Sequence, residues 1–228
     1  MLTFLLLAAV QAVPLPAVDG NRLRAGTRCF ALSREGQVLG AVRQTVAAAT
    51  VNGTPVWDIV IHQRLNDGKF DMRDHFVLRR ADLSPVSMEN QRFGEEHVRV
   101  SYAPGKITTI RKGAAPVETA VSGPIWDGNL WGLTFAALPL AGGGHYELPF
   151  YQYDKGLGRF VADVVGNETV QTPEGPVEAW VVELDLGRRG KVRYQIGKAD
   201  HAELGNVAGP FAQTLGGDCS AIGGSGEH

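Results

Sequence analysis

The sequence predicts a mainly β protein, a curled antiparallel sheet (an open or half barrel) with one short helix packed on it or in it. Three observations predict this class. Glycine and proline, 29 and 12 of the 228 residues, interrupt the chain at intervals that favour short strands. Between these interruptions, apolar and polar side chains alternate, and a single segment has helical periodicity. A hydrophobic content of 44% is enough to build a buried core.

The first element is an apolar run at residues 2–10 (LTFLLLAAV). It is too short to cross a bilayer, which takes about 20 residues, and small residues followed by Pro14 come after it. This pattern is typical of a cleaved secretory signal peptide at residues 1–12. The alternative is a buried first strand or helix. We expect three further parts: an N-terminal lead-in (13–34), an antiparallel β domain (35–204) and a Gly-rich C-terminal tail (205–228).

A β-hairpin is predicted for residues 56–65 and 69–79, around Asn66-Asp67-Gly68. If Asp67 and Gly68 form a type I′ turn, the register of the two strands is fixed. One face then carries apolar pairs, and the other carries polar and charged residues. A shift of one residue would mix the two sets, so the turn and the hydrophobic pattern agree. The apolar pairs are Trp57/Leu78, Ile59/Phe76 and Leu65/Phe70.

Further strands are predicted at 37–51, 97–103, 106–112, 145–153, 159–171, 176–186 and 190–196. The predicted helix opens at Asp127-Gly128-Asn129, with Asp127 as its N-cap, and stops at Pro139. Its apolar side would include Trp126, Trp131 and Phe135.

The sequence has two cysteines, Cys29 and Cys219. In an oxidising compartment they could form one disulfide that fastens the C-terminal tail to the first strand. The alternative is two unpaired thiols. A catalytic cysteine is disfavoured because Cys219 stands in a Gly/Ser-rich segment, and catalysis needs a held geometry.

Composition and motifs narrow the function classes. A net charge of −2 gives no electrostatic signature of a nucleic-acid partner. No later segment approaches 18 uninterrupted apolar residues, so we expect no membrane span in the mature chain. The standard nucleophile, phosphate-binding and metal-binding motifs are absent from the sequence. Binding is therefore favoured over catalysis, and no cofactor is expected.

One polar face of the predicted hairpin could support metal chemistry. His62 and His75 would be diagonal neighbours there, and Asp58 and Asp71 could complete a ligand set. The alternative is a solvated face of mixed charge, with Arg64 paired to Asp71.

Asp74 is expected on the apolar side of the same hairpin, opposite Ile61 and between Met72 and Phe76. A carboxylate in such surroundings should have a raised pKa or a buried partner. Three roles are open to it: contact with a ligand in a cavity, general acid or base catalysis, or a structural hydrogen bond at a wet barrel mouth.

Aromatic residues gather around the predicted helix and the strand after it. Core packing between helix and sheet is one explanation. If the sheet is only partly closed, the same residues would line an apolar pocket under a helical lid. The expected ligand-binding residues are Asp74, Trp126, Trp131, Phe135, Tyr146, Phe150 and Tyr151.

Three short stretches resemble the domain of unknown function 3108 family of exported bacterial proteins. They are Leu83-Ser84-Pro85-Val86-Ser87, Leu138-Pro139-Leu140 at the helix end, and the segment ETVQTPEGP at 168–176. The resemblance covers roughly residues 35–200. Such proteins are similar in fold class to the periplasmic lipoprotein carriers LolA and LolB, which implies an open antiparallel β-barrel with helices over an apolar cavity. The family supplies no catalytic residue.

The expected function is that of a soluble periplasmic protein, exported through its signal peptide, that binds an apolar ligand such as a lipid or acyl chain in a β-barrel cavity. Two alternatives follow: a non-catalytic scaffold of the cell envelope and, ranked last, a metal-assisted hydrolase.

Overall fold

The protein folds into one large curled β-sheet of 15 strands. The structure, a computed structural model, describes residues 14–187 and 190–222. The expected signal peptide (1–12) and the end of the expected tail (223–228) lie outside these residues. The predicted class, a mainly β curled sheet with one short helix, is confirmed.

The elements follow one another with short connections. A 3-10 turn, η1 (Gly20–Arg22), comes first, and α1 (Trp131–Ala136) follows β9. The strands are β1 (Gly26–Arg34), β2 (Gln37–Val51), β3 (Thr54–Leu65), β4 (Phe70–Arg79), β5 (Pro85–Arg92), β6 (Glu95–Ala103), β7 (Lys106–Arg111), β8 (Val117–Ala120), β9 (Trp126–Asp127), β10 (His145–Gln152), β11 (Gly156–Thr172), β12 (Gly175–Asp185), β13 (Lys191–Gly197), β14 (Glu203–Ala208) and β15 (Phe211–Leu215).

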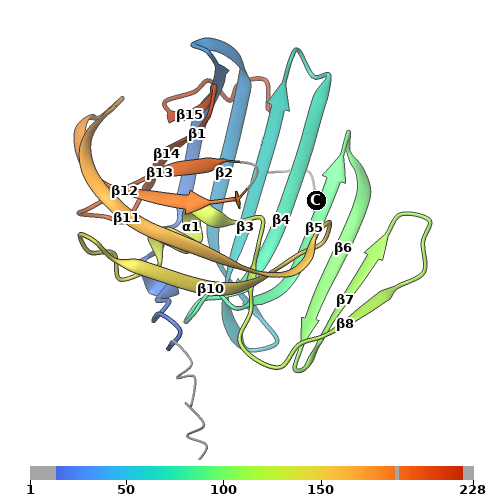
Figure 1. Cartoon of the computed structure of the whole chain (residues 1–228). Helices are drawn as coiled ribbons and strands as arrows, with labels where there is room; N and C mark the ends of the chain where they lie inside the picture. The colour runs from blue at the N-terminus through green and yellow to red at the C-terminus, as the bar shows by residue number, and fades with distance from the viewer. Residues whose placement is uncertain (1–13, 188–189, 223–228) are drawn as a thin grey trace, which may run out of the picture.

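The first and last strands pair in the middle of the sheet. Its order is β8-β7-β6-β5-β4-β3-β2-β1-β15-β14-β13-β12-β11-β10-β9, so β8 and β9 form the two edges. Neighbouring strands are antiparallel, except that β9 runs parallel to β10. In Figure 1, β2–β7 stand side by side while β10–β13 cross in front of them, with α1 between the two groups. No helix in the described residues is long and apolar enough to cross a membrane.

The predicted hairpin is confirmed as β3 and β4. Leu65 pairs with Phe70, and the Trp57/Leu78 and Ile59/Phe76 pairs form as expected. At the turn, Asp67 and Gly68 have φ of 55° and 82°, and the Lys69 amide donates to the Asn66 carbonyl at 3.1 Å. These are the features of a type I′ turn. Short-range turn chemistry and hydrophobic alternation therefore specify the same register.

The sheet extends beyond the expected β domain (35–204) at both ends. β1 lies in the expected lead-in, and most of β14 and all of β15 lie in the expected tail. Glycine in this tail serves close strand packing. A Cβ added at Gly205, where φ is +153°, would lie 2.2 Å from the Gln213 carbonyl oxygen on the neighbouring strand. The glycine content therefore marks tight pairing here, in place of a flexible segment.

The prediction that Asp127 caps the helix is wrong. α1 begins at Trp131, its N-cap position is Leu130, and Asp127 ends β9. The Asp127 carboxylate instead accepts hydrogen bonds from the backbone and side-chain nitrogens of Asn129, at 2.8 and 3.0 Å. This Asx turn satisfies the carboxylate before the helix begins, because Asp side chains bind amides two residues ahead.

The interior of the curled sheet is filled by one large apolar cluster. α1 packs against its inner face, where a Cβ added at Gly132 would lie 2.1 Å from the Glu203 carboxyl carbon. Only glycine allows so close an approach of this helix to β14. The largest fully buried side chains are Phe30, Phe76, Phe135, Ile59, Leu78, Leu83, Met88, Ile107, Leu138, Leu148, Leu184 and Ile196.

Cys29 and Cys219 form a disulfide, so the first of the two expected possibilities is confirmed. The bond joins residues 190 positions apart, with a Cα–Cα distance of 5.8 Å. Two arginines hold the segment after Cys219: Arg43 donates to the Ile222 carbonyl at 2.9 Å, and Arg64 to the Ala221 carbonyl at 3.1 Å. A stable disulfide fits a secreted or periplasmic protein.

Candidate ligand-binding site

Five aromatic rings meet on the inner face of the sheet, beside α1. We call Trp131, Phe135, Phe150, Phe160 and Tyr194 the aromatic cluster. The Trp131 ring lies 5.2 Å from Phe150 and 4.7 Å from Phe160, centroid to centroid, and the Phe135 ring lies 5.1 Å from Tyr194. Most of these contacts are edge-to-face, the geometry that aromatic pairs prefer. The cluster joins α1 to three strands, β10, β11 and β13.

The cluster contains three of the expected ligand-binding residues and two that the sequence reading missed. Trp131, Phe135 and Phe150 were expected together. Phe160 and Tyr194 stand within predicted strands, at positions where apolar and polar residues alternate. That alternation could have assigned both to the inner face.

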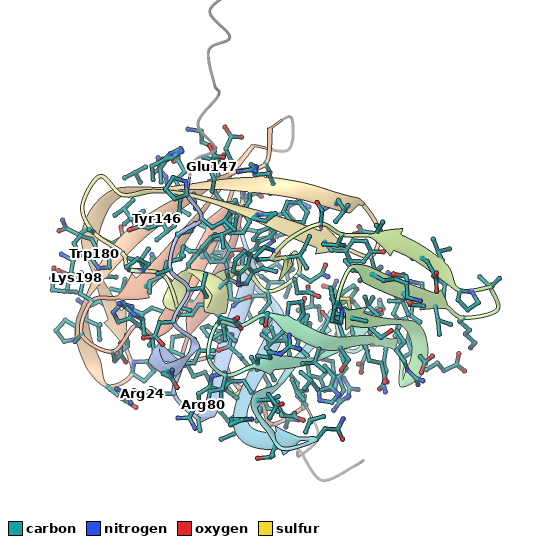
Figure 2. The ribbon with its side chains drawn as sticks, turned by 90° about the horizontal axis from the view of Figure 1, so that it is seen from below. Arg24, Arg80, Tyr146, Glu147, Trp180 and Lys198 are labelled. Carbon is teal, nitrogen blue, oxygen red and sulfur yellow. A yellow bond between two sulfur atoms is a disulfide. The ribbon has the colours of Figure 1, made fainter. Side chains whose placement is uncertain are left out.

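Two other expected residues lie apart from the cluster and fix chain connections. The Tyr146 hydroxyl donates to the Pro139 carbonyl at 2.6 Å, and the Trp126 indole donates to the Asp82 carbonyl at 3.0 Å. In Figure 2, Tyr146 and Glu147 mark neighbouring positions on β10. Tyr146 is buried, whereas Glu147 forms an ion pair with Arg159 at 2.9 Å.

Side chains alone join the two ends of the sheet. We call this junction, where β6 and β7 meet β9 and the end of β10, the seam. The Tyr102 hydroxyl donates to Asp127 Oδ2 at 2.8 Å, and Thr109 Oγ1 lies 2.6 Å from the Tyr151 hydroxyl. The Arg111 guanidinium also donates to the Tyr153 carbonyl. Within the described residues no ladder pairs β8 with β9, so backbone hydrogen bonds do not close the barrel here.

Asp74 lies on the inner face of β4, near the seam. It is 7% exposed and accepts a hydrogen bond from Asn90 Nδ2 at 2.6 Å. Burial raises the pKa of Asp74 to about 6, and the charge of Asp127 adds to this effect, whereas the Asn90 hydrogen bond and the charge of Arg92 oppose it. Both the raised pKa and the buried partner agree with the expectation from the hairpin register.

Asp127 is a second buried carboxyl group, on the other side of the seam. Burial raises its pKa to about 6, while hydrogen bonds from Asn129 and Tyr102 lower it. Two amide oxygens nearby, Asn90 Oδ1 and Gln152 Oε1, have no hydrogen-bond partner among the described protein atoms. Buried acceptors without partners are costly, so this polar region can receive a donor from water or from a ligand.

A further buried carboxyl group lies under α1. Glu203 Oε2 accepts a hydrogen bond from Gln44 Nε2 at 2.9 Å, and burial raises the Glu203 pKa. The sequence reading did not single out either residue, because each stands alone among apolar neighbours on its own strand. The pair fixes β14 to β2 across the interior.

The structure does not bring the expected metal ligands together. His62 Nε2 lies 2.8 Å from Asp71 Oδ1, and His75 Nε2 lies 3.1 Å from Asp58 Oδ2, as two separate pairs on β3 and β4. Within residues 14–187 and 190–222, no group of three or more His, Cys, Asp or Glu side chains is arranged to hold a metal ion. The expected Arg64–Asp71 pair is replaced by the His62–Asp71 contact.

Two small cavities stand out, and the aromatic cluster lines neither. One, of about 200 Å³, lies between β1, β2 and the segment fastened by the disulfide, and Ala31, Gly40 and Ile222 line it. The other, of about 170 Å³, lies at one end of the seam beside Tyr102 and Ile107. The rings of the aromatic cluster contact one another, so a ligand at this place must part them.

Comparison with known proteins places the chain in a family. Neither the curated proteins nor the solved structures include a match to it. One family does match, over residues 29–205, and its description is "Protein of unknown function (DUF3108)". The match includes β2–β13 and therefore the aromatic cluster, the seam and Asp74. Because the match covers well over half of the sequence, the chain belongs to the DUF3108 family.

Proposed function

We propose that this protein binds an apolar ligand, a lipid or acyl chain, inside the curled sheet. One observation carries the proposal: the aromatic cluster lies behind a seam that only side chains hold together. Side-chain bonds can open without unfolding a ladder. A ligand can therefore reach the cluster from the side.

The expected ligand-binding residues divide into three roles in this proposal. Trp131, Phe135 and Phe150 supply apolar contact area, and Tyr151 lies between them and the seam. Asp74 supplies a polar contact at one end. Trp126 and Tyr146 hold the connections on either side of α1.

Burial of the ligand supplies the affinity. Apolar area removed from water stabilises a complex by roughly 25 cal/mol per Å² before association costs. Against this, the ligand must replace ring contacts that are worth about 0.5–1.5 kcal/mol for each aromatic pair. A long chain replaces few such contacts for the area it buries, so long chains should bind better than short ones.

The proposal places the protein in the periplasm. Two features support this: the sequence pattern of a cleaved signal peptide at residues 1–12, and the Cys29–Cys219 disulfide. Intact mass measurement of the protein from a periplasmic extract tests the location. A mature chain that begins at Val13 is expected, and a chain that retains residues 1–12 would contradict it.

Ligand binding can be tested with an apolar fluorescent probe, N-phenyl-1-naphthylamine, and delipidated protein. We expect saturable uptake, which long-chain alcohols displace. Trp131→Leu should weaken uptake, because Trp131 makes three of the ring contacts. Trp180→Leu is the matched control, since the Trp180 ring lies outside the cluster and contacts Lys198 Nζ at 4.4 Å (Figure 2). Absence of saturable uptake by the unaltered protein would sink the proposal.

A scaffold without a ligand is the second candidate. The observation that favours it is the filled interior, in which neither of the two main cavities touches the aromatic cluster. Native mass spectrometry of the periplasmic protein, before and after denaturation, separates the two candidates. A mass that disappears on denaturation supports a carried ligand. A clean mass together with no probe uptake supports the scaffold.

A further inference from the structure

Four polar side chains from different strands meet at the seam. Arg92 ends β5, His97 lies in β6, Arg111 ends β7, and Tyr153 directly follows β10. The Tyr153 ring lies 6.4 Å from the His97 ring, and the Arg111 guanidinium carbon lies 5.5 Å from the Tyr153 centroid. Arg92 is within hydrogen-bonding reach of the Tyr153 hydroxyl. We call these four residues the arginine cluster.

The two guanidinium groups have no carboxylate ion-pair partner in the described part of the chain. Other exposed basic residues nearby do: Lys112 contacts Glu95 at 2.5 Å, and Arg99 contacts Glu96. Burial, together with the charges of Arg92 and Arg111, lowers the pKa of His97. Both positive charges therefore lie close to one imidazole, which is mainly neutral at neutral pH.

Two carboxyl groups lie near the arginine cluster without bonding to its guanidinium groups. Asp74, buried below it, and exposed Asp154 both raise the pKa of Tyr153. Asp74 uses one oxygen to accept from Asn90, and the pKa of its carboxyl group is already raised to about 6. The N–H donors of Arg92 thus remain free to bind another anion, and Arg111 uses one of its donors on the Tyr153 carbonyl.

The arginine cluster adjoins the proposed ligand site. Tyr153 packs against the apolar core, two residues beyond Tyr151. Strand registers place Arg111 in the same cross-strand row as Asn90 and Asp74, on the face that lines the interior. A chain lying in the aromatic cluster and leaving through the seam would pass these side chains.

We propose that Arg92 and Arg111, positioned by Tyr153 and His97, bind the anionic head group, a carboxylate or phosphate, of an amphiphile whose chain lies in the aromatic cluster. This inference rests on the proposed apolar-ligand function and adds the class of the ligand. Guanidinium groups suit it because their planar donors match carboxylate and phosphate oxygens in pairs. The free inorganic anion shares this chemistry, so the test must separate the two sources.

The test compares ligands that share one chain and differ in the head group. Delipidated protein is titrated with dodecanoate, dodecyl phosphate, dodecanol and inorganic phosphate, with displacement of N-phenyl-1-naphthylamine as the readout for the amphiphiles and calorimetry for phosphate. We expect the two anionic amphiphiles to bind about tenfold or more tightly than dodecanol, since a charge-assisted contact is worth roughly that factor. Inorganic phosphate alone should bind weakly.

A double variant, R92Q/R111Q, should abolish the preference for anionic head groups and leave dodecanol binding unchanged. Arg99→Gln is the matched control, because Arg99 is on the same part of the sheet but already contacts Glu89 and Glu96. Unchanged dodecanol binding also shows that the double variant is folded and that its apolar site is intact.

Each other outcome overturns a defined part of this inference. If dodecanol binds as tightly as the anionic amphiphiles, the apolar site stands and the head-group site is wrong. If inorganic phosphate binds as tightly as dodecyl phosphate, the site serves a free anion and the lipid source is wrong. If the double variant loses dodecanol binding as well, the arginines act structurally. If no amphiphile binds, the proposed function itself fails.

Discussion

At the scale of single residues, Asp74 makes stability depend on pH. Its pKa is raised from 3.8 to about 6 in the folded protein, because burial disfavours the charged carboxylate. A raised pKa means that the folded state holds a proton more tightly than the unfolded state. The stabilising effect of this proton is complete below pH 4 and is lost as the pH rises from 4 to 6.

Asp74→Asn should therefore increase stability at pH 7 and have little effect at pH 4. The amide oxygen of asparagine can still accept from Asn90, while the cost of a buried charge disappears. The gain at pH 7 is about 1–3 kcal/mol, an order-of-magnitude figure from the size of the shift. Urea unfolding of both proteins from pH 4 to 7 measures it. Asp127 contributes equally to both proteins, so a difference that does not grow with pH would contradict this account.

The Tyr102 hydroxyl is expected to matter more than its single hydrogen bond suggests. Tyr102→Phe leaves Asp127 Oδ2 buried without its donor. Loss of a bond to a charged, buried partner costs about 1.5–3 kcal/mol. Tyr146→Phe is the control, because it removes a bond of similar length to a neutral carbonyl. Urea unfolding at pH 7 should show the larger loss for Tyr102→Phe, and equal losses would mean that the seam adds nothing beyond an ordinary hydrogen bond.

At the scale of elements, the β3–β4 hairpin shows what local sequence can specify. Gly68 has φ of +82° in the turn, a region that disfavours any side chain. Gly68→Ala should destabilise the protein by about 1–2 kcal/mol. Gly123→Ala is the control, since Gly123 has no positive φ and a Cβ there would meet nothing within 4 Å. Thermal unfolding compares the two variants, and a stable Gly68→Ala protein would mean that the turn relaxes into another type.

Other elements show where local patterns mislead. Asp127 has the residue type and position of a helix cap, yet its carboxylate is held by Asn129 and Tyr102. Residues after 204 have the composition of a flexible tail, yet Gly205 lies in a strand whose neighbour leaves no room for a Cβ. In both cases the deciding contact comes from a distant part of the chain, which periodicity does not report.

At the scale of the whole molecule, the same limit applies to the candidate site. Three members of the aromatic cluster were predictable because they stand close together in the sequence and share apolar surroundings. The seam was not, because Thr109 and Tyr151 are 42 residues apart and neither lies in a recognisable motif. The arginine cluster combines residues of β5, β6 and β7 with one that follows β10, and only the curl of the sheet brings them together. Side chains that close a barrel have no local signature.

The disulfide tests how the whole sheet is held together. It links Cys29 to Cys219 close to the place where β1 pairs with β15, so that it reinforces the contact between the first and last strands. Closing a loop of 190 residues restricts the unfolded chain, and removal of such a bond costs about 2–5 kcal/mol. The double variant C29S/C219S should unfold at a lower urea concentration by this amount. Dithiothreitol should lower the midpoint of the unaltered protein to the same value and leave the variant unchanged. Equal midpoints for the unaltered protein and the variant would mean that the β1–β15 ladder alone holds the two halves together.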